Sequence, residues 1–184
     1  VSASGGSVDI VAPSTASNYT ATMPANSGTV ITTASTFAGT GPAFSAYASA
    51  TQSITTGIAT KVAINTEIFD TNSNYDNATY RFTPTVAGYY QINGTIRMGG
   101  SANTITQVIA MIYKNGTAYA RGSDVVFTSS TITNFEGLVG EVVYLNGSTD
   151  YVELYGYVTA TSPTFTYVTS AATSRFSAAL VRAE

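Results

Sequence analysis

Apolar and polar residues alternate along most of this chain, and no stretch keeps the period of a helix. The alternation is most regular between residues 89 and 98. One side of that stretch carries Tyr90, Ile92, Ile96 and Met98, and the other carries Tyr89, Gln91, Asn93, Thr95 and Arg97. Residues 42–54, 57–70 and 151–158 behave similarly, and Phe176, Ala178 and Leu180 alternate near the end. The pattern predicts an all-β chain of many short strands, arranged as a sandwich, jelly roll or barrel.

Asn-Gly dipeptides interrupt the alternation at three places. Asn115-Gly116 and Asn146-Gly147 each separate two strand-like runs, and both residue types tolerate the positive φ that a tight hairpin turn requires. We therefore predict hairpins at these two sites, the second with a slightly longer loop. Asn93-Gly94 lies in the middle of a predicted strand, where a bulge or a close backbone approach fits better.

The first forty residues have a different character from the rest. They hold short β-prone pieces separated by Pro13, Pro24 and Gly28, and they have few large side chains with which to bury a core. Residues 37–44 are rich in glycine and proline, which is typical of a linker. We predict a stem or attachment segment at residues 1–40, which needs a partner to be ordered, and a head domain at residues 41–184.

Charged residues make up only 9% of the chain, against about 25% in an average globular protein. The surface must therefore be built from Thr, Ser, Asn, Gln, Gly and Tyr. The net charge of −3 and the lack of a basic cluster argue against a nucleic-acid partner. The longest apolar run is far shorter than the roughly 20 residues that span a bilayer, which argues against membrane insertion.

The chain contains no histidine and no cysteine. It therefore lacks the commonest general base, and it offers no thiolate for a metal. Its carboxylates are scattered, although the fold could still bring two of them together. We expect a protein without enzymatic activity, cofactor or metal.

Residues 82–92 resemble the signature of the complement component one-q globular head. Phe82, Gly88 and Tyr90 have the family's spacing, and Asp70 and Tyr75 occupy its two upstream positions. The runs "AFSAYAS" at 43–49 and "RFSAALV" at 175–181 resemble the family's first and last strands. The resemblance covers about residues 42–183. The departures from the pattern are Ile64, Ile92, Gly94 and Ala178, and the family's calcium ligands have no clear counterpart here.

The resemblance implies a jelly roll of about ten antiparallel strands, similar to tumour necrosis factor, that assembles as a homotrimer. The expected core of the head contains Phe44, Phe82, Tyr90, Ile92, Phe176 and Leu180. Several strands also carry large groups on their second face, which suits a subunit interface. The residues expected in the trimer interface are Tyr89, Gln91, Asn93, Tyr155 and Tyr157. The plainer interpretation is that exposed tyrosines decorate a polar surface.

Residues 1–40 resemble in composition the short β-modules of phage fibres. The hypothesis is therefore a fibre or knob on a virion surface that attaches to a host, with residues 1–40 contacting other virion proteins. Loops 70–80 and 159–170 could bind a host glycan or protein. Asn74, Tyr75, Phe165 and Tyr167 are the candidate residues, although the family signature would turn Tyr75 inward. The alternatives are a capsid decoration protein and a bacterial or secreted surface protein of the same fold.

Overall fold

The computed structural model describes residues 41–99, 105–127, 132, 134–161, 164–166 and 173–184. Contacts divide the chain into two units, Val1–Ile31 and Thr32–Glu184, and every described residue belongs to the second. The boundary predicted near residue 40 stays a prediction, because residues 1–40 lie outside the described residues. Nowhere in the described ranges is there a helix of the length and apolarity needed to cross a membrane.

The described residues form strands joined by turns and loops. In chain order the strands are β1 (Ala43–Tyr47), β2 (Ser53–Thr55), β3 (Thr60–Lys61), β4 (Thr66–Asp70), β5 (Tyr75–Asp76), β6 (Arg81–Phe82), β7 (Ala87–Gly99), β8 (Ile105–Lys114), β9 (Thr117–Val126), β10 (Asn134–Asn146), β11 (Val152–Ala160), β12 (Thr164–Thr166) and β13 (Arg175–Ala183). All pairings are antiparallel. The all-β class predicted from the alternation is confirmed. Five of the described strands, β2, β3, β5, β6 and β12, are only two or three residues long.

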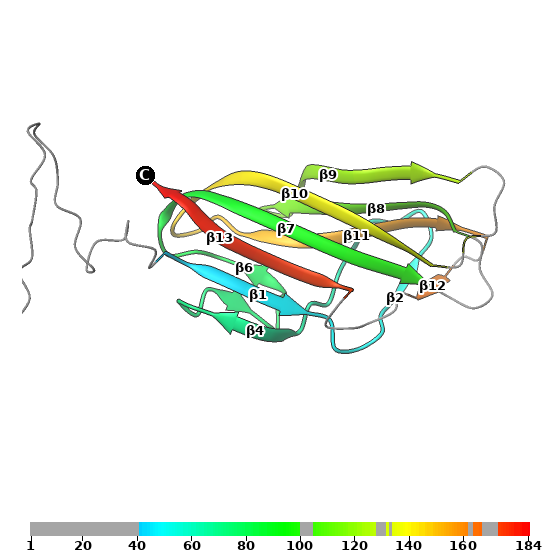
Figure 1. Ribbon diagram of the computed structural model, residues 1–184, viewed down its shortest axis with the longest axis horizontal. Helices are drawn as coiled ribbons and strands as arrows, with labels where there is room; N and C mark the ends of the chain where they lie inside the picture. Colours follow the sequence, from blue (N-terminus) through cyan, green and yellow to red (C-terminus); the bar gives the residue numbers. More distant parts are fainter. Residues whose placement is uncertain (1–40, 100–104, 128–131, 133, 162–163, 167–172) are drawn as a thin grey trace, which may run out of the picture. The chain divides into compact units, whose positions relative to one another are not determined.

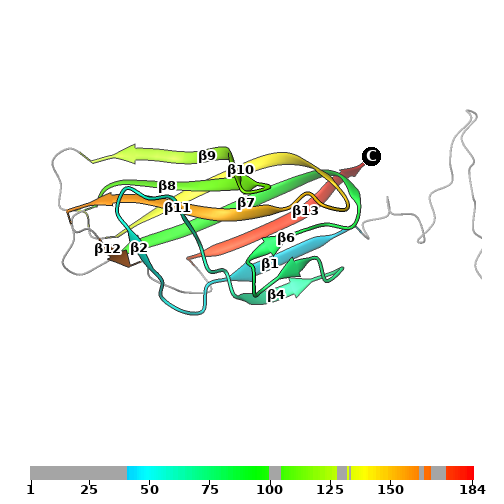
Figure 2. The same cartoon turned by 180° about the vertical axis from the view of Figure 1, so that it is seen from behind.

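Two sheets pack face to face. The first has five strands in the order β10-β7-β13-β1-β4, and the second has six, in the order β5-β6-β11-β8-β9 with β3 paired to β11. Figure 1 looks onto the first sheet, where β13 lies between β7 and β1, and Figure 2 looks onto the second. The first and last described long strands are therefore neighbours, as in a jelly roll. A third pairing joins β2 to β12.

A cluster of aromatic rings joins the two sheets at one end of the core. Phe44 on β1 stacks on Tyr75 at 4.4 Å and on Phe82 at 4.7 Å between ring centroids. Phe176 meets Phe44 edge-on at 5.2 Å, and Tyr90 meets Phe82 edge-on at 5.6 Å. Of the residues predicted for the core, Phe44, Phe82, Tyr90, Ile92 and Phe176 are fully buried, while Leu180 is partly buried against them.

The loop between β4 and β5 is shaped by the residues at the upstream signature positions. The Asp70 carboxylate accepts hydrogen bonds from the backbone N–H groups of Asn72 and Tyr75, at 3.2 and 2.7 Å. The Tyr75 hydroxyl then donates to the carbonyl oxygen of Ile64 at 2.6 Å. Because both ends of Tyr75 are held, its ring enters the core rather than solvent.

The two Asn-Gly sites predicted as hairpins have different outcomes. Asn115 and Gly116 have φ values of 53° and 78° and join β8 to β9 in one sheet, so that prediction is confirmed. The prediction of a hairpin at Asn146-Gly147 was wrong, because β10 pairs with β7 while β11 pairs with β8. The Asn146 side-chain oxygen accepts three backbone N–H groups of this loop, which turns the chain from one sheet to the other.

Gly94 makes room for a side chain of the opposite sheet. The pairing of β7 continues without a shift at this residue, so there is no bulge. A Cβ atom at Gly94 would lie 2.3 Å from Cδ1 of Leu154 on β11. The close approach predicted at Asn93-Gly94 therefore exists, but it is made by the Leu154 side chain and not by backbone.

Replacing Gly147 should destabilise the head more than replacing Gly57. Both glycines have positive φ, +70° and +77°, but a Cβ at Gly147 would lie 2.3 Å from the backbone nitrogen of Ala87, whereas one at Gly57 meets nothing within 4 Å. We expect Gly147→Ala to lower the free energy of unfolding by about 3 kcal/mol and Gly57→Ala by about 1 kcal/mol. Denaturant unfolding of both variants tests this, and equal losses would contradict it.

Candidate functional site

The outward side of the five-stranded sheet, here called the β7 face, is assembled row by row from paired strands. Inward residues of β7 such as Tyr90 and Ile92 are buried, so their alternating neighbours face away from the core. Residues paired across two antiparallel strands share a face. The resulting β7–β10 rows are Tyr89 with Tyr144, Gln91 with Val142, Asn93 with Gly140, Thr95 with Leu138, and Arg97 with Glu136.

Large apolar groups are exposed on the β7 face. Leu138 is 53% exposed, Val142 is 44% exposed and Tyr89 is 46% exposed. Phe69, which pairs with Ser45 at the β4 edge, is 49% exposed. The charged pair Arg97 and Glu136 lies in the last of the rows. Arg175 and Arg182 also lie on this face, because they pair with Thr95 and Tyr89 of β7. A sheet face with several large exposed apolar groups is typical of a surface that a partner covers.

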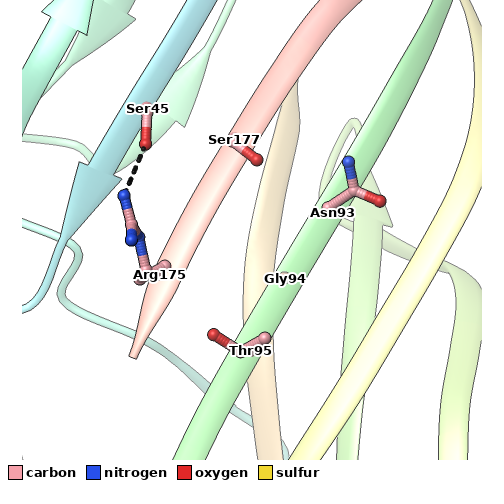
Figure 3. Close-up of a pocket in the computed structure, with 6 residues that line it drawn as sticks. All are labelled: Ser45, Asn93, Gly94, Thr95, Arg175 and Ser177. Carbon is pink, nitrogen blue, oxygen red and sulfur yellow. Dashed lines mark hydrogen bonds between the residues drawn. The ribbon is translucent and has the colours of Figure 1, made fainter. Parts of the chain in front are cut away.

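The middle of the β7 face is hollowed, as Figure 3 shows. A depression of about 190 Å³ is lined by Ser45, Asn93, Gly94, Thr95, Arg175 and Ser177. A second one of about 290 Å³ lies between β7 and β10, beside Leu138 and Gly140. The first depression results from a row of small residues across three strands, in which Ser45 pairs with Ser177 and Ser177 pairs with Asn93. The Arg175 guanidinium bends toward Ser45 and donates to its hydroxyl at 3.4 Å.

The outward side of the six-stranded sheet, here called the β11 face, carries the other predicted interface residues. Leu154 and Val158 of β11 are buried inward, so Tyr155 and Tyr157 face outward and are half-buried. Tyr89, Gln91 and Asn93 lie on the β7 face instead. The five residues predicted for one interface therefore belong to opposite sides of the sandwich. Alternation in a sequence separates inward from outward residues, but it does not say which sheet a strand joins.

A buried carboxylate organises one end of the β11 face. Glu153 is 1% exposed although it points outward, and one oxygen, Oε1, accepts hydrogen bonds from two cations. Lys61 Nζ lies 2.8 Å away and Arg81 Nε lies 2.7 Å away. The Arg81 guanidinium also lies over the Tyr151 ring, 4.2 Å from its centroid. The hydrogen bond to Glu153 raises the pKa of Arg81, against a smaller effect of desolvation.

A pair of stacked tyrosines lies beside Glu153 on the β11 face. The rings of Tyr113 on β8 and Tyr155 on β11 are 3.7 Å apart between centroids and nearly parallel. Burial raises the pKa of Tyr155, and the nearby Glu153 charge adds to the effect. Met111 pairs with Tyr155 and so lies on the outward side, yet it is nearly buried. These rings therefore form a stacked pair rather than isolated surface groups.

Sequence reasoning missed the cluster of Lys61, Arg81 and Glu153. The two cations lie 92 and 72 residues from the carboxylate in the chain. The available signal was a lone Glu between outward-facing tyrosines in a chain with very few charges. No spacing rule could have named its partners, because they lie on two short strands whose pairing depends on the fold.

The residues predicted for the ligand loops are only partly described. Asn74 and Tyr75 are 7% and 6% exposed, so the prediction that they contact a ligand was wrong. The Asn74 side-chain oxygen accepts the backbone N–H of Thr85, and burial in the core raises the pKa of Tyr75. Phe165 belongs to β12 and pairs through its backbone with Ile54. Tyr167 lies outside the described residues.

No protein-family model matches the chain, and no curated protein matches it in sequence. Solved structures match its fold. The globular domain of zebrafish complement 1qA protein matches with a TM-score of 0.54 at 16% identity, over 78% of this chain and 99% of that one. Eiger TNF from S. frugiperda matches with a TM-score of 0.57 at 8% identity, over 77% and 91%. Murine APRIL at pH 5.0 gives 0.56 at 8%, over 77% and 99%.

At these identities the likeness shows the fold alone. The chain has the jelly roll of the complement 1q and tumour necrosis factor domains, as the resemblance at residues 82–92 implied. Among the residues that the structure describes, no group of three or more acidic side chains is placed to hold a metal ion.

Removing the Glu153 charge should destabilise the head. Glu153→Gln leaves two cations beside a neutral amide, although both cationic side chains are about one-third exposed and regain some hydration. We expect a loss of about 2 kcal/mol in the free energy of unfolding. Asp124→Asn is the matched control, because its ion pair with Arg121 is well exposed, and about 0.5 kcal/mol or less is expected. Denaturant unfolding at neutral pH measures both. A loss at Asp124 as large as that at Glu153 would contradict the prediction.

Proposed function

We propose that this chain forms a homotrimeric jelly-roll head and that the β7 face lies in the subunit interface. The observation that carries the proposal is the exposure of Leu138, Val142 and Tyr89 on one hollowed sheet face. Burying about 100 Å² of apolar surface contributes about 2.5 kcal/mol, so covering several such groups favours association. The resemblance to the complement one-q head, whose members form homotrimers, supports three subunits rather than two.

A three-fold assembly joins two different patches of each subunit. A cyclic trimer closes through heterologous contacts, in which one surface of a subunit meets another surface of its neighbour. The small residues Ser45 and Ser177 leave a hollow in the β7 face that can receive a protruding side chain. The β7 face is therefore assigned to one half of that contact.

The head is proposed to sit on a virion surface and to attach the particle to its host. The support is the resemblance of residues 1–40 to fibre modules, together with a head of the size and fold of binding domains. Three copies in one head, and several heads per particle, would convert weak contacts into avidity. Residues 1–40 would then hold the head to other virion proteins.

Charges placed on the β7 face should separate the subunits without unfolding them. Static light scattering of the full chain is expected to give three times the chain mass of 19.1 kDa. Leu138→Asp combined with Val142→Asp should shift this to the monomer mass, because interface cores exclude unpaired charge. Ile58→Asp is the control, since Ile58 is 56% exposed in a loop outside the β7 face. A folded monomer for the unaltered chain would overturn the proposal.

Soluble head should compete with virus for cells. If the head attaches the particle to its host, adding purified full chain reduces adsorption of the virus in a dose-dependent manner. The double variant Leu138→Asp/Val142→Asp should compete at least ten times less well, because it has lost multivalency. Binding of the chain to empty particles without any effect on adsorption would instead indicate a capsid decoration protein.

A further inference from the structure

The guanidinium of Arg81 is fixed on two sides and open on a third. Its Nε donates to Glu153 at 2.7 Å, and its plane lies over the Tyr151 ring at 4.2 Å. Within the described residues, its two terminal NH₂ groups have no hydrogen-bond partner, and the side chain is 38% exposed. An immobilised guanidinium with free terminal donors is the geometry that takes a carboxylate or phosphate through two parallel hydrogen bonds.

Lys61 brings a second cation to the same point. Its Nζ donates to the same Glu153 oxygen at 2.8 Å and to the carbonyl of Thr79 at 3.2 Å. An ammonium has three hydrogens, so one donor remains for a ligand. Lys61, Arg81 and Glu153 together carry a net charge of +1, before the neighbouring Asp76 is counted.

One further carboxylate faces Arg81. Asp76 pairs with Arg81 between β5 and β6, and it is exposed. Its oxygens accept hydrogen bonds from the Thr79 hydroxyl at 2.6 Å and from the N–H of Ala78 at 2.8 Å, which holds them within their own turn. Asp76 therefore reduces the positive potential at Arg81 without occupying the free donors.

Tyr155 lies beside the cations on the β11 face, because its cross-strand partner on β3 is Lys61. Tyr155 follows Glu153 by two positions on the same face, which is about 7 Å in a strand. Its ring is fixed by stacking on Tyr113 at 3.7 Å between centroids, which covers one of its two faces. Lys61 therefore lies next to the ring, and Arg81 lies at Glu153, about 7 Å along the strand. The apolar C–H face of a sugar packs on an aromatic ring, while an acidic substituent reaches the charge beside it.

We propose that the β11 face binds an acidic sugar, with Arg81 and Lys61 holding its anionic group and Tyr155 packing against its ring. The anionic group is a carboxylate or a phosphate, since both accept the paired donors of a guanidinium. The biological role of this site rests on the attachment function proposed above. The site itself is built from residues of one chain, so its binding does not depend on the trimer.

Saturation-transfer NMR on the full chain tests the site with four probes. Glucuronic acid and glucose 6-phosphate supply the two anionic groups, and glucose and galactose are the neutral controls. We expect at least one acidic probe to bind at least ten times more tightly than glucose, with saturation reaching its ring protons. Comparison of the two acidic probes identifies the preferred anion. Equal binding of acidic and neutral probes, or no binding of either acidic probe, would overturn the proposal.

Substitutions distinguish the site from general charge attraction. Arg81→Lys keeps the cation beside Glu153 but loses the paired donors, and it should weaken acidic-probe binding at least fivefold. Tyr155→Leu should weaken it several-fold, and Asp76→Asn should strengthen it about twofold. Arg121→Gln, on β9 three strand spacings or about 14 Å from β6, removes the same charge and should change binding less than twofold.

The substitution results also separate this proposal from the proposed function. Unchanged binding in both Arg81→Lys and Tyr155→Leu would overturn the sugar site, whatever the oligomeric state. Light scattering on the same samples reports the trimer independently, so a monomer that binds acidic sugars would overturn the trimeric head while keeping the site. Thermal unfolding of each variant identifies any loss of binding that follows from misfolding. For a variant that misfolds, Arg81→Gln or Tyr155→Ile provides the replacement measurement.

Discussion

The stacking of Phe44 between Tyr75 and Phe82 is the contact on which the rest of the head depends. Phe44 belongs to the five-stranded sheet, and the other two rings belong to the short strands at the edge of the six-stranded sheet. Strands of two residues have too few backbone hydrogen bonds to hold themselves in place. Their rings anchor them instead, and through β6 the same contact positions Arg81 beside Glu153.

The scarcity of charged residues explains which residue types cover the two outer faces. With 9% of its residues charged, the chain must cover its sheets with tyrosine, threonine, serine and small residues. On the β7 face this leaves apolar groups around a hollow, which suits another subunit. On the β11 face one carboxylate gathers two cations, and the tyrosines beside it stack. The two faces thus differ in chemistry although the same residue types cover them.

Local sequence signals predicted the structure correctly where a few neighbouring residues determine it. The turn at Asn115-Gly116 depends on φ at two residues, so its sequence was sufficient to predict a hairpin. Asn146-Gly147 carries the same signal, yet its strands enter different sheets. Likewise, Tyr75 is in an apparent loop but is drawn inward by Asp70 and Ile64.

The sequence by itself determined the all-β class, the inward residues of the most regularly alternating strands and the aromatic positions of the core, because alternation with a period of two follows directly from backbone geometry. The tertiary structure alone decided which sheet each strand joins. It therefore decided that Tyr89 and Tyr155 lie on opposite faces, and that Lys61, Arg81 and Glu153 meet. Pairing between distant strands is a property of the whole core, since each strand takes the neighbour that completes the burial of both sheets.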